Sequence, residues 1–191
     1  MAASELSSFA SNSIIHYNRT MLEIDGVTIF ELPHRHVDER GEFIKVLSLN
    51  LTPKLRIEEV LFSKTKKGFV RGMHFQNGPF LNNRIITCLV GKVFDVLLDL
   101  RPSSDTFLNI FSIELDSLFP QAIYVPAGVA HGFQSMENNS QMLYFSDKVY
   151  DSNFDSGVAP IEFGLDWPMR VKGMSKRDAT LPTLSEYLLR I

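Results

Sequence analysis

The sequence has little cysteine and no long apolar run. Cys88 is the single cysteine among 191 residues, which excludes an intrachain disulfide framework and a cysteine-based zinc site and suits a reducing compartment. The most apolar stretch, residues 89–101, is interrupted by charge every few positions, which excludes a span of about 20 apolar residues. No basic and apolar leader opens the sequence, so we expect a cytoplasmic protein with no membrane partner.

An excess of one charge is also missing. The formal net charge is −3, so there is no global positive field of the kind that attracts nucleic acid, and any anion must be bound by local groups. The hydrophobic share of 45% is typical of a globular domain and disfavours disorder. The length fits one domain of roughly 100–200 residues. We expect a loose arm over residues 1–20 and one domain over residues 21–191.

Helical periodicity is missing between residues 24 and 145, where short apolar runs alternate with Gly, Pro, Asn and Asp. This rhythm predicts an all-β sandwich or jelly roll whose interior can host a ligand. Residues 92–115 predict a β-hairpin in which Asp95 and Asp99 share one face, and that face is either wet or lines a polar cavity. The leucine spacing over residues 183–190 predicts a short C-terminal helix.

The segment KGFVRGMHFQ, residues 67–76, carries a histidine in an apolar strand context. Because side chains alternate along a strand, His74 shares a face with Gln76, while Met73 and Phe75 point the other way. A single histidine in this setting is more often a satisfied core group than a base.

Two further segments carry polar groups beside glycine. In YVPAGVAHGF, residues 124–133, a Pro-x-Gly turn precedes His131 at the start of the next expected strand, which would aim one imidazole into a barrel. In DERGEF, residues 38–43, the glycine after Arg40 lets a guanidinium approach a phosphate without a neighbouring side chain in the way. Taken alone, this second string is more often a solvated charged loop.

Five strings read in series are more specific than any of them alone. DERGEF, RGMHFQ, GKVFDVLLDLR, YVPAGVAHGF and MSKRDATLP resemble, in order and spacing, the motifs of the dTDP-4-dehydrorhamnose 3,5-epimerase family, from about residue 25 to the C-terminus. The resemblance implies a cupin jelly roll, usually a homodimer, that epimerises a nucleotide-linked 4-keto-6-deoxy sugar without a metal or an organic cofactor.

The resemblance also implies catalytic roles for four residues. A proton next to a ketone becomes removable when a base lies over it and the enolate oxygen is stabilised. His74 is the implied base, and Asp178 is the implied partner that fixes its tautomer. Tyr144, thirteen residues after His131, is the implied acid on the opposite face. Arg84 stands where the family places a lysine that stabilises the enolate, and its planar fork changes the donor geometry.

The expected substrate-binding residues are Arg40, Arg71, His131, Gln76 and Glu59. Arg71 and His131 would orient the sugar and the diphosphate. Arg40 would reach the diphosphate, from the partner subunit if the protein is a dimer.

Departures from the family's pattern leave the nucleotide open. Glu59 and Leu61 stand at or near positions where the family usually carries Gln and Asn. Val149 and Tyr150 align with a tyrosine pair that includes the expected stacking partner for thymine. A dTDP-, UDP-, CDP- or GDP-linked keto sugar is therefore compatible with the sequence.

Three other functions stay open. A metal-dependent cupin usually carries His-x-His followed by Glu, but the residues after His74 lack this pattern, and His34 and His36 lie far from the His131 segment, so no metal is expected. A non-catalytic sugar-nucleotide-binding cupin would not need a base and an acid on opposite faces. A 3,4-ketoisomerase would start with the same enolate, although the RGMHFQ string is more like the epimerase form.

Overall fold

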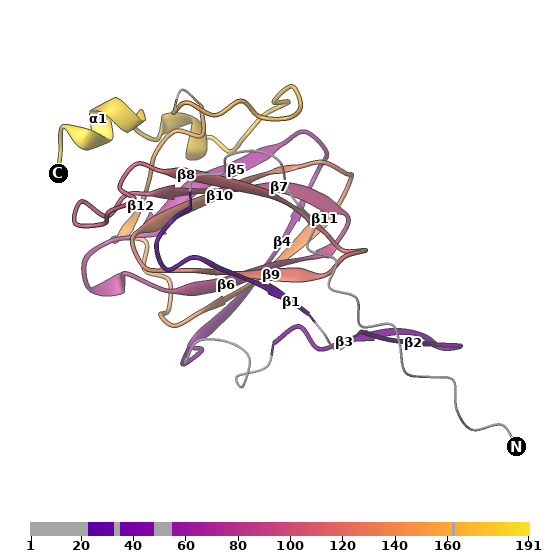
Figure 1. The fold of residues 1–191 in the computed structure, drawn as a ribbon. Helices are drawn as coiled ribbons and strands as arrows, with labels where there is room; N and C mark the ends of the chain where they lie inside the picture. Colours follow the sequence, from indigo (N-terminus) through magenta and orange to yellow (C-terminus); the bar gives the residue numbers. More distant parts are fainter. Residues whose placement is uncertain (1–22, 33–34, 48–54, 162) are drawn as a thin grey trace, which may run out of the picture.

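A computed structural model describes residues 23–32, 35–47, 55–161 and 163–191. Within these residues two five-stranded antiparallel sheets face each other (Figure 1). In spatial order the first sheet contains β1 (Thr28–Glu31), β9 (Gln121–Val125), β6 (Arg84–Val90), β11 (Ser140–Ser146) and β4 (Glu59–Thr65). The second contains β12 (Asp155–Gly157), β5 (Val70–Gln76), β10 (Val129–Ser135), β7 (Lys92–Asp99) and β8 (Ile110–Asp116). The expected arm over residues 1–20 lies outside the described residues.

The chain crosses repeatedly from one sheet to the other, which is why residues distant in sequence meet in the interior. Successive strands β4 and β5, β6 and β7, and β9 to β11 alternate between the two sheets. This is the connectivity of an antiparallel jelly roll. The all-β prediction is confirmed, and side chains from both sheets point into one shared space.

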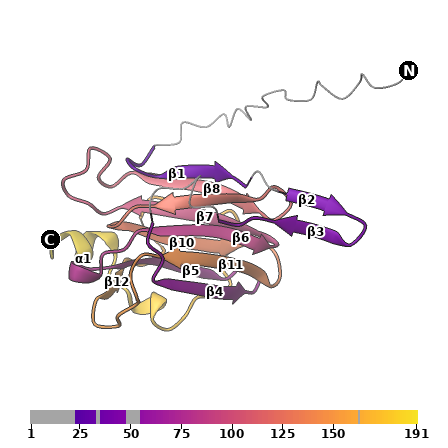
Figure 2. The same cartoon turned by 90° about the horizontal axis from the view of Figure 1, so that it is seen from below.

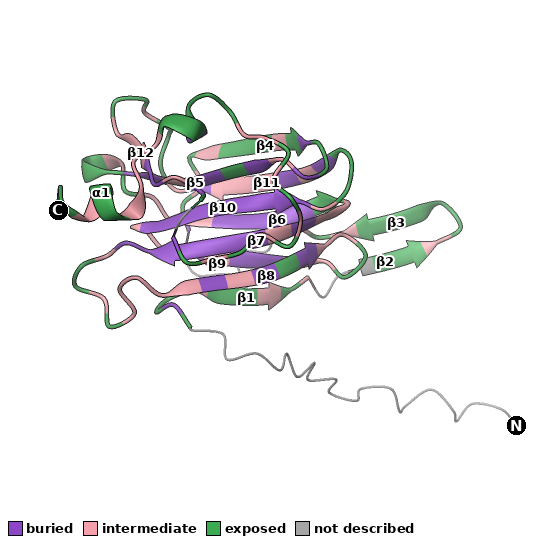
Figure 3. Cartoon of the chain, turned by 90° about the horizontal axis from the view of Figure 1, so that it is seen from above, coloured by how far each residue is buried: buried purple, intermediate pink, exposed green. Residues whose placement is uncertain are grey.

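The C-terminal segment covers the outer face of the second sheet. Phe94, Val96 and Leu98 pack there against Trp167 and Tyr187, while alternate residues of β7 face the first sheet across the main core. Because both faces of the second sheet are covered, β7 and β10 are buried along nearly their whole length. Figure 3 shows these strands largely buried.

The predicted hairpin is confirmed, with β7 and β8 paired antiparallel. The two aspartates of β7 do not face water, because both are fully buried, so the solvent-exposed alternative for that face was wrong. Asp95 faces His131 in the interior. Asp99 is bound by the guanidinium of Arg101 and by neighbouring hydroxyls.

The short helices lie outside the two sheets. The predicted C-terminal helix is α1 (Leu184–Leu188), which begins at Thr183 with a capping box completed by Glu186. Two 3-10 turns, η1 (Gly78–Phe80) and η2 (Asp178–Thr180), precede it. No helix in the described part of the chain is long and apolar enough to cross a membrane.

A separate hairpin projects from the body. It consists of β2 (Arg35–Asp38) and β3 (Gly41–Ile44), which form their own two-stranded sheet (Figure 2). Val37 and Phe43 on this hairpin are exposed, although a free apolar surface of this kind is costly in water.

Candidate active site

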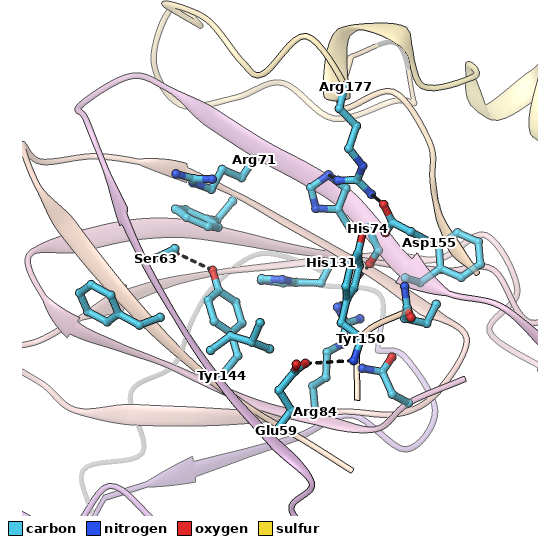
Figure 4. A pocket seen from close by; sticks show the side chains of 16 residues that line it. Glu59, Ser63, Arg71, His74, Arg84, His131, Tyr144, Tyr150, Asp155 and Arg177 are labelled. Atoms are coloured by element: carbon cyan, nitrogen blue, oxygen red, sulfur yellow. Dashed lines mark hydrogen bonds and ion pairs between the residues drawn. The ribbon is translucent and has the colours of Figure 1, made fainter. Parts of the chain in front are cut away.

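A cavity of about 280 Å³ opens between the two sheets (Figure 4). Its lining includes seven of the nine residues singled out from the sequence: Glu59, Arg71, His74, Gln76, Arg84, His131 and Tyr144. Of the other two, Asp178 lies directly behind His74, and Arg40 lies outside the cavity. Five strands, β4, β5, β6, β10 and β11, contribute these seven side chains.

Two glycines allow the histidine-bearing strands to approach closely. A Cβ on Gly72 would lie 2.4 Å from the Cα of Gly132, and Gly72 has a φ of +131° that favours glycine. At this contact β5 and β10 pair so that His74 and His131 are register partners. Two imidazoles from separate sequence motifs therefore reach the same cavity.

His74 forms a pair with a buried carboxylate. Its Nε2 lies 2.8 Å from Asp178 Oδ1, and Asp178 Oδ2 accepts from the backbone N–H of Gly72 at 3.3 Å. Burial alone would raise the pKa of Asp178, but hydrogen bonds from His74, Ser175 and Gly72 outweigh it and hold that pKa below its ordinary value. Because a carboxylate only accepts, the proton lies on Nε2, and Nδ1 is the nitrogen free to take up a proton.

Tyr144 lies on the opposite sheet from His74. Its hydroxyl and that of Ser63 on β4 are joined by a hydrogen bond of 3.1 Å, and the ring meets His131 edge-on at 6.0 Å between centroids. Burial raises the pKa of Tyr144 well above its ordinary value, beyond what the bond to Ser63 offsets. The phenol is therefore protonated at neutral pH and can act as an acid.

Arg84 brings a cation into the cavity from β6. Its Nη2 donates to the carbonyl of Val129 at 2.9 Å and its Nη1 to that of His74 at 3.4 Å. Its Nε is buried and has no partner among the described residues. Burial lowers the pKa of Arg84 to about 10, with Tyr144 and Asp95 opposing the shift, so the group keeps its charge at neutral pH.

His131 has a carboxylate partner of its own, which sequence reasoning did not assign. Its Nε2 lies 2.7 Å from Asp95 Oδ2, and both side chains are buried. Burial raises the pKa of Asp95, against the opposing effects of His131 and Arg84. The sequence placed Asp95 on the same strand face as Asp99, which made Asp95 a candidate to line a polar cavity. It did not show which histidine Asp95 would contact.

The other expected ligands lie along the cavity wall or outside it. Arg71 donates to Thr65 Oγ1 at 2.8 Å. The Oε1 of Gln76 accepts from the backbone of residue 151 at 2.9 Å, and Glu59 accepts from the backbone N–H of Tyr150 at 3.2 Å. Arg40, at the turn of the β2–β3 hairpin, is 83% exposed and bound to the aspartate two residues before it.

Besides Asp95, three neighbours of the candidate site were not singled out from the sequence. Arg177 Nη1 lies 2.7 Å from His74 Nε2, and Asp155 holds Arg177 in an ion pair. Ser63, which bonds the catalytic tyrosine candidate, is the third. Of these three, only Arg177 could have been suspected from the sequence, because it directly precedes Asp178. In the described ranges no group of three or more His, Cys, Asp or Glu residues is arranged to hold a metal ion.

Solved structures define the class of this protein. A 4-keto-6-deoxy sugar epimerase from the novobiocin biosynthetic gene cluster of Streptomyces spheroides aligns with a TM-score of 0.83 and 31% identity over 88% of each chain. An epimerase from Mycobacterium tuberculosis gives a TM-score of 0.80 and 31% identity over 88% of this chain and 89% of that one. The fold is therefore the predicted cupin jelly roll, and the class is that of the sugar epimerases.

Sequence comparison gives the family. The dTDP-4-dehydrorhamnose 3,5-epimerase family model matches residues 21–186. The Salmonella typhimurium enzyme of that name is 32% identical over 174 residues, covering 87% of this chain and 94% of the relative. A dTDP-4-dehydrorhamnose 3-epimerase from Streptomyces niveus is 32% identical over 173 residues, with coverages of 86% and 83%. The chain belongs to the dTDP-4-dehydrorhamnose 3,5-epimerase family, so the resemblance carried by the five motifs is confirmed.

Proposed function

We propose that this protein inverts C3, C5 or both of a nucleotide-linked 4-keto-6-deoxy sugar through an enolate, without a cofactor. The observation that carries the proposal is one cavity holding a carboxylate-paired imidazole, His74, on one sheet and a protonated phenol, Tyr144, on the other. Inversion needs a base and an acid on opposite sides of the same carbon, and the two sheets supply one each.

The first step is proton abstraction. Nδ1 of His74 takes the proton from a carbon next to the C4 ketone, and the C–H electron pair moves into the ring to give an enolate at the C4 oxygen. Asp178 stabilises the imidazolium that forms. Arg84 supplies a fixed cation for the developing negative charge, and a preorganised donor of this kind is among the larger contributions to catalysis.

The second step is reprotonation from the other face. Tyr144 donates its phenolic proton to the carbon, which restores the ketone and leaves a phenolate. The phenolate then takes a proton from solvent while His74 returns its own, so no proton is gained or lost over the cycle. The raised pKa of Tyr144 means that the phenol gives up its proton to the strongly basic enolate rather than to water.

The substrate is proposed to carry a nucleoside diphosphate, with dTDP as the first nucleotide to test. A 3'-monoepimerase from Streptomyces bikiniensis, 25% identical with a TM-score of 0.81, has been solved in complex with dTDP-quinovose. In this chain Arg71 lines the cavity and is an exposed cation suited to a phosphate oxygen. Gln76, Glu59 and His131 are the proposed sugar contacts.

We further propose a homodimer. Strand β4 is an edge of the first sheet, and its Val60 and Phe62 are exposed, as are Val37 and Phe43 on the projecting hairpin. Pairing with a second copy would cover these apolar groups and would let Arg40 reach the partner's cavity. Light scattering should give twice the 21.7 kDa mass of one chain. The free buried thiol is consistent with the proposed cytoplasmic location.

Proton NMR in D₂O tests the reaction directly. The wild-type chain is incubated with dTDP-, UDP-, CDP- and GDP-linked 4-keto-6-deoxyglucose, and the loss of each ring-proton signal is followed. The expected result is deuterium at C3, C5 or both for one nucleotide, with exchange at least about 10³-fold slower in His74→Gln. If the wild-type protein exchanges no ring proton of any of the four sugars, the proposal is refuted. If His74→Gln exchanges as fast as wild type, the assignment of His74 as the base is refuted.

A further inference from the structure

The base proposed above is contacted by charges of both signs. His74 Nε2 lies 2.8 Å from Asp178 Oδ1 and 2.7 Å from Arg177 Nη1. These two neighbours are consecutive in sequence, where the chain enters η2. Figure 4 shows the Arg177 side chain reaching from the C-terminal segment to the imidazole. Among the described residues, these two are the hydrogen-bonding contacts of the ring.

One ring nitrogen cannot satisfy both neighbours at once. A carboxylate accepts and a guanidinium donates, whereas Nε2 has either a proton to give or a lone pair to offer. Asp178 is 2% exposed, and its Oδ1 also lies 3.5 Å from Arg177 Nη1. The contact with Nε2 is shorter, at 2.8 Å, and a buried carboxylate needs its donors, so the Nε2 proton is directed to Asp178. Arg177 then acts on the imidazole through its charge.

A second carboxylate holds Arg177 in this position. Arg177 Nη2 forms an ion pair with Asp155 Oδ2, and Asp155 lies on β12, which pairs with β5 beside His74. The Tyr150 side chain faces Asp155. Burial raises the pKa of Tyr150, and the neighbouring Asp155 carboxylate raises it further. Arg177 is thus anchored to the same sheet as the base, although its side chain is 41% exposed.

We propose that Arg177 is a positioning residue that keeps His74 in its neutral, proton-accepting form. The inference rests on the epimerase function proposed above. A neighbouring anion favours the imidazolium and a neighbouring cation disfavours it, so Asp178 and Arg177 act in opposite directions. Asp178 supports the imidazolium that forms during turnover, while Arg177 prevents the ring from holding a proton before the substrate arrives.

The other charged groups around His74 are less direct. From β10, its register partner His131 is tied to Asp95. From β6, Arg84 contacts the backbone carbonyl of His74 and not the ring. Glu59 from β4 lines the same cavity and is bound to the backbone of residue 150. Among the described residues, no hydrogen bond or ion pair joins these three groups to Arg177, whereas Asp155 and Asp178 are both paired with it. Replacing Arg177 therefore acts on the ring through the contact at Nε2 and through these two carboxylates.

The first test reads the imidazole without turnover. Nitrogen-15 NMR of the full chain follows the charge and tautomer of His74 against pH, with the signal assigned by its loss in His74→Gln. Arg177→Met should move the midpoint of His74 protonation to higher pH, because it removes a cation that disfavours the imidazolium. Arg177→Lys, which keeps the charge, should move it by less than half of that. Arg177→Gln is the second neutral variant if the Met variant does not fold.

The matched control is Lys176→Met, which removes the same charge from the exposed neighbouring residue. Its midpoint should equal that of wild type. An unchanged midpoint in the neutral Arg177 variants would overturn the proposal. An equal movement in Lys176→Met would overturn it too, since the effect would then reflect overall charge.

Kinetics separate this role from substrate binding. In Arg177→Met the acidic limb of the kcat/KM profile should move to higher pH, in step with the NMR midpoint, while KM at pH 8.5 changes less than twofold. A tenfold rise in KM with an unmoved acidic limb would show that Arg177 binds the substrate anion, and the proposal would be wrong. If wild type turns over no sugar nucleotide, the epimerase function fails on that result alone, and the NMR midpoints still decide the role of Arg177.

Discussion

Replacing Asp178 by Asn is the sharpest test of the proposed base. Asp178 accepts from His74 at Oδ1 and from the Gly72 N–H at Oδ2. An amide has a single acceptor oxygen, so the Asp178→Asn side chain must present its NH₂ group either to the ring or to the backbone donor. Neither arrangement keeps both bonds while the proton stays on Nε2, and the negative charge that stabilises the imidazolium is lost in both.

The size of the effect follows from these lost contacts. A hydrogen bond to a charged group contributes about 1.5–3 kcal/mol, and each 1.36 kcal/mol corresponds to roughly tenfold in rate. An amide NH₂ group facing the Gly72 N–H, or stabilisation of the wrong tautomer of His74, adds to this free-energy cost. We expect kcat to fall by about 10²–10³ and KM to change less than about threefold, because Asp178 lies behind His74 and not in the cavity lining.

Deuterium exchange at the sugar carbon is the assay, since it reports the abstraction step alone. Asp166→Asn is the control, because it makes the same chemical change at an exposed position of the C-terminal segment, and it should exchange at the wild-type rate. Exchange by Asp178→Asn within threefold of wild type would refute the reasoning. If Asp166→Asn slowed exchange by the same factor, the effect would be due to disturbance of the C-terminal segment instead.

Three other predictions concern the acid, the enolate site and stability. Tyr144→Phe should reduce inversion about 10²-fold more than deuterium exchange, and NMR of the product epimer against deuterated substrate checks this; Tyr187→Phe, outside the cavity, is its control, and equal loss of both activities would contradict the acid role. Arg84→Lys keeps the charge but not the fork that spans two carbonyls, so we expect about a tenfold lower kcat, against about 10²–10³ for Arg84→Met; equal rates in the two variants would exclude a role for the charge. Burial alone would raise the pKa of Asp99, but bonds from Arg101 and neighbouring hydroxyls outweigh it and lower that pKa from 3.8 to about 2. The stability from Asp99 is therefore present above about pH 4 and is lost as pH falls toward 2, by about 1 kcal/mol once the 22% exposure of its partner Arg101 is allowed for. Urea unfolding of Asp99→Asn should show a shallower decline over this range, and a parallel decline would contradict the assignment.

The sequence predicted the elements better than the contacts between them. Alternation along β5 placed His74 and Gln76 on one face and was correct, because side-chain direction in a strand follows from local geometry. The partner of His131 could not be predicted, because the pairing of β10 with β7 that brings Asp95 beside it joins segments 36 residues apart. Motif resemblance supplied Asp178 for the same reason, since spacing along the chain does not indicate that η2 folds back onto β5.

Interpretation of charged residues depended most on burial. Asp95 and Asp99 were equally compatible with a solvent-exposed face, and the burial of both side chains removes that alternative. Asp95 lies in the interior against His131, and Asp99 is bound by Arg101. Arg40 read as a phosphate ligand, but in a single chain it lies on an exposed hairpin turn. In the proposed homodimer, the role of Arg40 would depend on where the second copy places that hairpin.

The two histidine–carboxylate pairs in the cavity differ in a way that divides their roles. Asp178 receives bonds from the Gly72 backbone and from the ring, and its pKa lies below the ordinary value. Asp95 has one oxygen without a partner among the described residues and a pKa raised by burial. A firmly charged carboxylate stabilises an imidazolium better than one whose charge is costly. We therefore expect His74 to abstract the proton, whereas His131, held by Asp95 and in contact with the ring of Tyr144, is better suited to orient the sugar.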